Sequence, residues 1–151
     1  MNSPKTTKSI QSLEEMRAFA KACAASLPSR ALLLLDGPMG AGKTQFTKFL
    51  VEALGSSETV SPSFAIHNSY VGRNRTIEHF DLFRLESEED LESTGFWDFF
   101  RAKEGLVIIE WSAKLNEFGL YRQLPRSWWT QQLQFQNLGG ESRVVEMTTR
   151  N

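Results

Sequence analysis

A glycine-rich segment in the first third of the chain has the residue types and spacing of a phosphate-binding loop. It matches G-x-x-x-x-G-K-[ST] in full with Gly37, Pro38, Met39, Gly40, Ala41, Gly42, Lys43 and Thr44. Glycines let successive N–H groups point at phosphate oxygens, and a following helix N-terminus adds positive partial charge. We expect Lys43 to neutralise the β- and γ-phosphates and Thr44 to bind Mg²⁺, with Gln45 adjoining the loop. The segment predicts binding of a nucleoside triphosphate.

Two carboxylates are candidates for metal and water chemistry. Glu110 is the first polar residue after the apolar run Leu106–Ile109, which would place it at the carboxyl edge of a parallel sheet, where a P-loop site needs an acid for Mg²⁺. The alternative is a surface glutamate at a strand end. Asp81 shares a strand face with His79 and can position or deprotonate the attacking water, or hold a metal-bound water. His79 alone is more often a packed, hydrogen-bonded histidine than a catalyst.

The elements that must position these residues follow from local patterns. Ser12 and Glu15 have the spacing of a capping box, which predicts a helix from residue 13 to about 27. Residues 31–35 form a short apolar run typical of a buried strand. An amphipathic helix is expected over about 43–54. The order is therefore strand, glycine loop and helix, which is the context that the phosphate-binding motif requires.

The remaining segments predict two hairpins and a second buried strand. The pattern predicts one hairpin from residues 64–70 and 75–82, and a second hairpin from residues 132–136 and 143–148. It predicts a buried strand over residues 106–109. An acidic stretch after the first hairpin can start a helix. We predict one α/β domain over residues 1–151, a P-loop NTPase-like fold in three layers with a mixed parallel and antiparallel sheet, preceded by a flexible polar tail over 1–11.

Composition narrows the function classes. One Cys among 151 residues excludes a disulfide scaffold and fits a reducing, cytoplasmic location. No apolar run reaches the roughly 18 residues of a membrane span, and the first residues lack a signal-peptide apolar region. A net charge of −1 disfavours binding of bare nucleic acid through the protein's overall field.

Four segments in order resemble the TsaE family, the small ATPase of bacterial tRNA threonylcarbamoyladenosine synthesis. They are GPMGAGKT, SPSF with the later Tyr70, HFDLFRL and IIEWSAKL, and the resemblance spans about residues 12–125. It implies an ATP- and Mg²⁺-dependent ATPase that is slow alone and resets a complex of TsaB and TsaD homologues. It also implies that the protein contacts tRNA only through that complex and does not associate with a membrane.

The same resemblance suggests a switch-like loop and a contact residue. Ser61, Pro62 and Ser63 resemble a loop lying over the phosphate site, although the same three residues would also make an ordinary turn. Arg84 aligns with a family arginine that could contact phosphate or a partner; the alternative is a solvated charge.

The resemblance also implies roles for three residues near the phosphates. Asp81 is similar to the family aspartate important for hydrolysis, and Glu110 to the Mg²⁺-associated glutamate. Trp111 resembles the tryptophan that follows that glutamate, although from the sequence alone a tryptophan here is more often a core or rim residue.

Aromatic residues in the second half of the chain are candidates for an apolar contact surface. They are Trp97, Phe99, Phe100, Trp128 and Trp129. The alternative, that most of them are core residues, is favoured.

Two other functions remain open from the sequence. In a small-molecule or nucleotide kinase, Asp81 would activate a substrate hydroxyl, but the chain shows no arginine-rich lid segment. A nucleotide-dependent binding module would hydrolyse nucleotide only incidentally. A GTPase is disfavoured because no N-K-x-D segment for reading guanine occurs.

Overall fold

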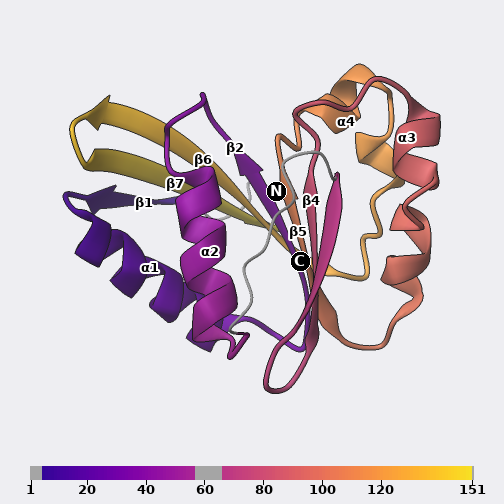
Figure 1. Cartoon of the computed structure of the whole chain (residues 1–151), viewed down its shortest axis with the longest axis horizontal. Coiled ribbons are helices and arrows are strands. Elements are labelled where there is room, and N and C mark those ends of the chain that lie inside the picture. Colours follow the sequence, from indigo (N-terminus) through magenta and orange to yellow (C-terminus); the bar gives the residue numbers. More distant parts are fainter. Residues whose placement is uncertain (1–4, 57–65, 151) are drawn as a thin grey trace.

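The computed structural model describes residues 5–56 and 66–150, and a seven-stranded sheet runs through its centre (Figure 1). The strand order is β1-β7-β6-β2-β5-β4-β3. β2 pairs in parallel with β5 and β6, and β4 with β5, whereas the pairs β1–β7, β6–β7 and β3–β4 are antiparallel. The strands are β1 Lys5–Ile10, β2 Arg30–Asp36, β3 His67–Val71, β4 Thr76–Asp81, β5 Gly105–Glu110, β6 Trp129–Gly139 and β7 Ser142–Arg150. The predicted mixed sheet is confirmed.

Helices cover both faces of this sheet and complete the three layers (Figure 1). α1 and α2 pack together on one face, and α3, the 3₁₀ helix η1 and α4 lie on the other. Their bounds are α1 Leu13–Ser26, α2 Lys43–Ala53, α3 Glu88–Glu92, η1 Phe96–Arg101, α4 Lys114–Glu117 and η2 Tyr121–Gln123. None of the helices in the described parts of the chain is long and apolar enough to cross a membrane.

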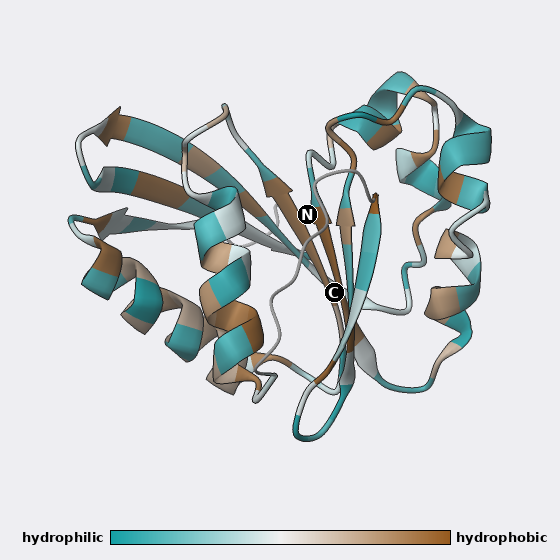
Figure 2. Ribbon diagram, in the orientation of Figure 1, coloured by the Kyte–Doolittle hydropathy of each residue, from teal (hydrophilic) through white to brown (hydrophobic). Residues whose placement is uncertain are grey.

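The central strand β2 separates two apolar cores. Leu33 and Leu35 face the core under α1 and α2, where they join Phe46. Leu32 and Leu34 face the core under α3 and η1. Because both faces of β2 are buried, its sequence is continuously apolar rather than alternating. Figure 2 shows this as brown colour on the central strands.

Helix α1 begins as the capping pattern predicted. The Ser12 hydroxyl accepts a hydrogen bond from the Glu15 N–H at 3.1 Å, and the Glu15 carboxylate accepts one from the Gln11 N–H at 3.1 Å. The carboxylate thus binds the N–H one residue before the position that a capping box normally uses. Both bonds satisfy amides at the helix start, and they fix where the preceding strand β1 meets the helix.

The predicted flexible tail over residues 1–11 is wrong for residues 5–10. These residues form β1, whose partner is β7 in an antiparallel register that runs from Lys5–Thr148 to Ile10–Arg143. Only Ile10 of this strand is buried. β1 is an edge strand held by main-chain hydrogen bonds, and its exposed side chains give the sequence no apolar alternation to detect.

Candidate functional site

The glycine loop connects the end of β2 to the start of α2. Gly37 and Gly42 adopt positive φ angles of 139° and 108°, which side chains other than glycine rarely tolerate. A Cβ at Gly37 would lie 2.5 Å from the carbonyl oxygen of Phe135 on β6. The glycines are therefore required by the close approach of the loop to β6 as well as by its curvature, and the loop places Lys43 at the first position of α2.

Lys43 is buried within the loop that it closes. Its Nζ donates hydrogen bonds to the carbonyls of Gly37 and Pro38, the latter at 3.0 Å, and lies 4.0 Å from the ring centre of Trp111. Burial lowers the pKa of the Lys43 ammonium below its usual value, while nearby carboxylates, Glu110 first, oppose that shift. The ammonium is thus directed toward the loop interior, where phosphate oxygens would lie in a P-loop site.

Thr44 and Glu110 meet across the site. The Thr44 hydroxyl donates to Glu110 Oε1 at 2.9 Å, joining the first turn of α2 to the end of β5. Glu110 is only 1% exposed, whereas Thr44 is exposed. The prediction that Glu110 lies at the carboxyl edge of a parallel sheet is confirmed, and the alternative of a surface glutamate is not.

Asp81 ends β4 in register with Glu110 on β5. Its Oδ1 accepts a hydrogen bond from the Phe83 N–H at 3.1 Å, which fixes the carboxylate in a short turn. Burial raises the pKa of Asp81 above its usual value; the Phe83 hydrogen bond opposes this shift and Glu110 adds to it. A carboxylate with a raised pKa accepts a proton more readily, which suits a general base.

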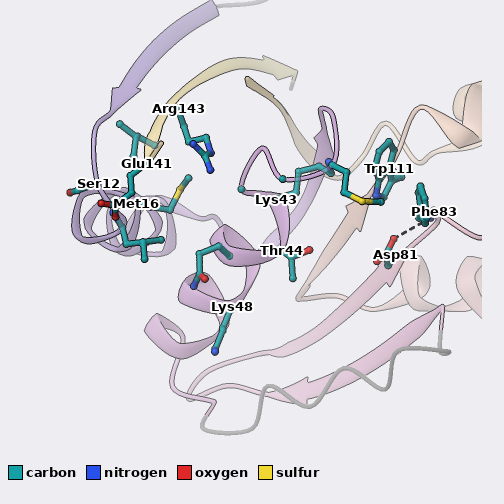
Figure 3. A pocket seen from close by; sticks show the side chains of 16 residues that line it. Ser12, Met16, Lys43, Thr44, Lys48, Asp81, Phe83, Trp111, Glu141 and Arg143 are labelled. Atoms are coloured by element: carbon teal, nitrogen blue, oxygen red, sulfur yellow. Dashed lines mark hydrogen bonds between the residues drawn. The ribbon is translucent and has the colours of Figure 1, made fainter. Parts of the chain in front are cut away.

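Lys43, Thr44 and Asp81 line a cavity of about 730 Å³ (Figure 3), and Glu110 lies just behind Thr44 without lining it. Lys43 and Thr44 lie in its middle, with Asp81, Phe83 and Trp111 toward one end. At the other end lie Ser12 and Met16 of the α1 start, Glu141 of the β6–β7 turn and Arg143 of β7 (Figure 3). The remaining lining residues are Ile10, Leu13, Met39, Gly40, Gly42, Gln45 and Lys48.

The α1 end of the cavity was not predicted from the sequence. Glu141 Oε1 accepts a hydrogen bond from the Leu13 N–H at 3.1 Å, and this bond ties the β6–β7 turn to the start of α1. Arg143 donates to Asn137 Oδ1 at 3.0 Å and to the Gly140 carbonyl at 2.7 Å, so its guanidinium is held against the end of β6 and the β6–β7 turn. Apolar side chains with flanking polar groups are typical of a site for the base of a nucleotide.

The other loop residues divide between the cavity and the core. Met39, Gly40, Gly42 and Gln45 line the cavity, as a binding role requires. Gly37 and Pro38 contribute the carbonyls that hold Lys43, and Ala41 is fully buried in the core beneath α1 and α2.

Neither of the two predicted contact segments, Arg84 and residues 61–63, is found lining the cavity. Arg84 is exposed and does not line the cavity. Ser61, Pro62 and Ser63 fall outside the described residues, so their role as a switch-like loop stays a prediction.

Trp111 occupies the cavity rim in an unusual backbone conformation. Its φ of +59° is left-handed, which costs roughly 1–2 kcal/mol for a residue other than glycine. The conformation is held because the Trp111 N–H donates to the Leu35 carbonyl at 2.8 Å and Asp36 accepts from the Ala113 N–H at 2.9 Å. The turn directs the Trp111 ring under Lys43 and against Phe83, with the latter ring centre 4.9 Å away.

The aromatic candidates for a contact surface are mostly packed. Trp128 is 2% exposed and donates from Nε1 to the Phe100 carbonyl at 3.1 Å, so it is a core residue. Trp97, Phe99 and Phe100 are partly buried against the core under α3 and η1, and Trp129 against the core under α1 and α2. The core alternative is therefore correct for Trp128, and the other four each keep an exposed part.

Comparison with known proteins gives the family of this chain. The family model described as "Threonylcarbamoyl adenosine biosynthesis protein TsaE" matches residues 10–144, which contain every described site residue named above. The chain belongs to the TsaE family. The resemblance of the four sequence segments is thereby confirmed, and the family extends further along the chain than the segments alone indicated, to the strand β7.

Individual TsaE relatives and one solved structure agree with this assignment. The chain is 34% identical over 136 residues to the TsaE protein of Bacillus subtilis, covering 89% of this chain and 80% of the relative. It is 37% identical over 105 residues to the TsaE protein of Rickettsia conorii, covering 68% of this chain but only 59% of that longer relative. The crystal structure of Bacillus subtilis YdiB has a TM-score of 0.76 at 27% identity and covers 100% of this chain and 89% of the solved chain. The α/β P-loop-like fold is confirmed.

Proposed function

We propose that this protein binds ATP with Mg²⁺, hydrolyses it slowly, and thereby resets a complex of TsaB and TsaD homologues during tRNA threonylcarbamoyladenosine synthesis. One observation supports the proposal most: the Thr44 hydroxyl and the Glu110 carboxylate converge at 2.9 Å beside the buried ammonium of Lys43. A hydroxyl, a carboxylate and an ammonium held together at a P-loop are the groups that bind and activate a triphosphate.

The residues present fit both ATP and Mg²⁺. Thr44 and Glu110 supply hard oxygen donors, which Mg²⁺ prefers. Among the described residues no group of three His, Cys, Asp or Glu side chains could hold a metal alone. A Mg²⁺ ion held by Thr44 and Glu110 would therefore take its other ligands from phosphate oxygens and water, as is usual for this ion. At the α1 end, Ile10, Leu13 and Met16 offer an apolar surface to a base.

The chain's own residues then divide the chemistry. Mg²⁺ held by Thr44 and Glu110 would neutralise negative charge on the phosphates. Lys43 contributes a second positive charge at the phosphates. Asp81, held by the Phe83 N–H, orients the attacking water or accepts its proton. Because hydrolysis needs mainly positioning and charge stabilisation, these few groups are sufficient for a basal reaction.

Slow turnover follows from the placement of the cationic side chains. Among the described residues that line the cavity, the only arginine is Arg143, which lies at the α1 end rather than beside Asp81. Charge developing on a transferred phosphoryl group is usually stabilised by an arginine as well as a lysine, and its supply in trans accelerates related enzymes by roughly 10³–10⁵-fold. A partner that completes the Asp81 end of the cavity is the natural activator.

Phosphate release with and without purified TsaB–TsaD tests this function. We expect a low rate for the protein alone and stimulation by the complex. Asp81→Asn should bind ATP normally and lower hydrolysis by roughly 10²–10⁴-fold, because the general base is lost. Asp98→Asn, at an exposed aspartate of η1, is the matched control and should behave as wild type.

Other outcomes would point to the rival functions. Label transferred from ATP to a small acceptor instead of water would identify a kinase. Hydrolysis that neither the complex stimulates nor Asp81→Asn reduces would identify a binding module with incidental turnover.

A further inference from the structure

Glu110 is held at both of its carboxylate oxygens. Thr44 donates to Oε1, and His79 Nε2 lies 2.5 Å from Oε2. The His79 and Glu110 side chains are only 6% and 2% exposed, so this contact is shielded from water. The imidazole comes from β4 and the hydroxyl from α2, so two different elements fix the orientation of a single carboxylate. His79 does not line the cavity, and its contact with the site passes through Glu110.

The register of the sheet explains how His79 reaches Glu110. β4 and β5 are parallel, with His79 opposite Ile108 and Asp81 opposite Glu110. Side chains two residues apart on a strand point to the same face. His79 therefore lies on the α2 side of the sheet, one step behind Asp81, and points diagonally at the carboxylate. Phe80, between them, points into the opposite core.

The two ring nitrogens of His79 differ in their contacts. Within residues 5–56 and 66–150, the buried Nδ1 has no hydrogen-bond partner. A histidine kept for structure alone usually satisfies both nitrogens when buried, and an unpaired buried polar atom is costly. The Nε2–H tautomer of His79 would donate to an ionised Glu110 carboxylate, which only accepts hydrogen bonds. The polar contact of the ring is therefore directed at Glu110.

We propose that His79 is a positioning residue that holds Glu110 ready to bind the nucleotide-associated divalent cation. This inference rests on the proposed function and extends it to a residue outside the cavity. Donors behind a metal-binding carboxylate fix its orientation, and their removal typically weakens metal binding or activity by roughly 10–100-fold. Without His79, the Glu110 carboxylate keeps one donor, Thr44, and is free to rotate away from the metal position.

The test measures cation affinity directly. Mn²⁺ is titrated into the full-length protein saturated with ADP, and free Mn²⁺ is followed by electron paramagnetic resonance. ADP affinity is measured separately in EDTA. We expect His79→Leu to weaken Mn²⁺ binding by roughly 10–100-fold and to leave metal-free ADP affinity unchanged.

Two polar variants keep the test decisive if His79→Leu does not fold. His79→Gln places an amide donor close to the position of Nε2 and should retain most of the Mn²⁺ affinity. His79→Asn carries the same amide on a shorter side chain, cannot reach Glu110, and should resemble His79→Leu. Rescue by glutamine and not by asparagine is a result that loss of packing alone would not give.

His67 provides the matched control. Its Nε2 contacts Glu78 at 3.1 Å on the neighbouring strand, so His67→Leu removes a similar histidine–glutamate pair outside the site. If Mn²⁺ affinity is unchanged in all His79 variants, or is lowered equally by His67→Leu, the role of His79 is overturned while the proposed function still stands. Wild-type protein that binds no Mn²⁺ with ADP would instead refute the proposed function.

Discussion

Asp81 and Glu110 are direct neighbours on the parallel strands β4 and β5, so two carboxylates end side by side at one edge of the sheet. Their hydrogen bonds differ. Glu110 is bonded by side-chain donors at both oxygens, whereas the bond that fixes Asp81 comes from the backbone of Phe83. Asp81 is also the more exposed of the two. This difference supports a division of roles, with Glu110 for the metal and Asp81 for water.

Lys43→Ala should weaken ATP binding by roughly 100-fold, because charge-assisted hydrogen bonds to the phosphates are lost. A fluorescent ATP analogue titrated into each variant measures the effect. Lys114→Ala removes a lysine that pairs with Glu117 outside the cavity and should bind the analogue as wild type does. Equal affinities for the two variants would mean that the P-loop lysine does not contact phosphate.

Gly37→Ala and Gly40→Ala should differ sharply in stability, although both residues have positive φ angles. A Cβ at Gly37 would meet the Phe135 backbone oxygen at 2.5 Å, whereas a Cβ at Gly40 has nothing within 4 Å. We expect Gly40→Ala to lose about 1–2 kcal/mol of unfolding free energy from backbone strain alone. Gly37→Ala should lose more than ~3 kcal/mol, since the clashing backbone cannot relax cheaply. Urea unfolding of the pair tests whether the loop is packed against β6 as described.

The Cys23 thiol should be unreactive in the folded protein. Burial raises its pKa from 9.0 to about 12. Because the thiolate is the reactive form, iodoacetamide at pH 8.5 should label native protein at least ~10-fold more slowly than protein in urea. As the pH rises above 9, the unfolded state loses this proton first, so the folded state loses stability up to about pH 12. Cys23→Ala should lose less unfolding free energy than wild type between pH 9 and about pH 12. If both proteins show the same dependence of stability on pH, the thiol is exposed to solvent.

Trp128→Ala should be far more damaging to stability than Trp97→Ala. Trp128 is 2% exposed, packs against Phe100 and donates to its carbonyl, and replacement of such a residue by alanine costs roughly 3–5 kcal/mol. Trp97 is only partly buried, and we expect a loss of about 1 kcal/mol. If Trp97 belongs to a docking face, its replacement should also reduce stimulation by TsaB–TsaD without changing the basal rate. Normal stimulation would assign it to packing alone.

The P-loop end of the cavity could be predicted from the sequence because its signals are local. The loop pattern occupies eight consecutive residues, and β2 and β5 are apolar on both faces, so the positions of Lys43 and Thr44 at the start of α2 and of Glu110 at the end of β5 could be predicted. The two-residue period of β4 indicates that Asp81 shares a face of that strand with His79. These residues lie close in space because parallel strands bring their carboxyl ends to one edge, a rule that needs no knowledge of particular contacts.

The other end of the site could not be predicted because its contacts are distant in the chain. Leu13 and Glu141 meet through a backbone-to-carboxylate bond, and β1 is held by main-chain pairing with exposed side chains. Neither leaves a periodic or motif signal. The partnership of His79 with Glu110 was also missed, because the sequence showed a histidine on the correct face but not the diagonal reach across β4 and β5.

The bond between Leu13 and Glu141 joins residues 128 positions apart and closes the α1 end of the cavity. On the ribosome, the P-loop and the strands β2, β4 and β5 emerge before the β6–β7 hairpin exists. A nascent chain therefore has to wait for β6 before the glycine loop can pack against Phe135, and for β7 before β1 can pair. Newly made protein should therefore complete this cavity only after synthesis has passed β7.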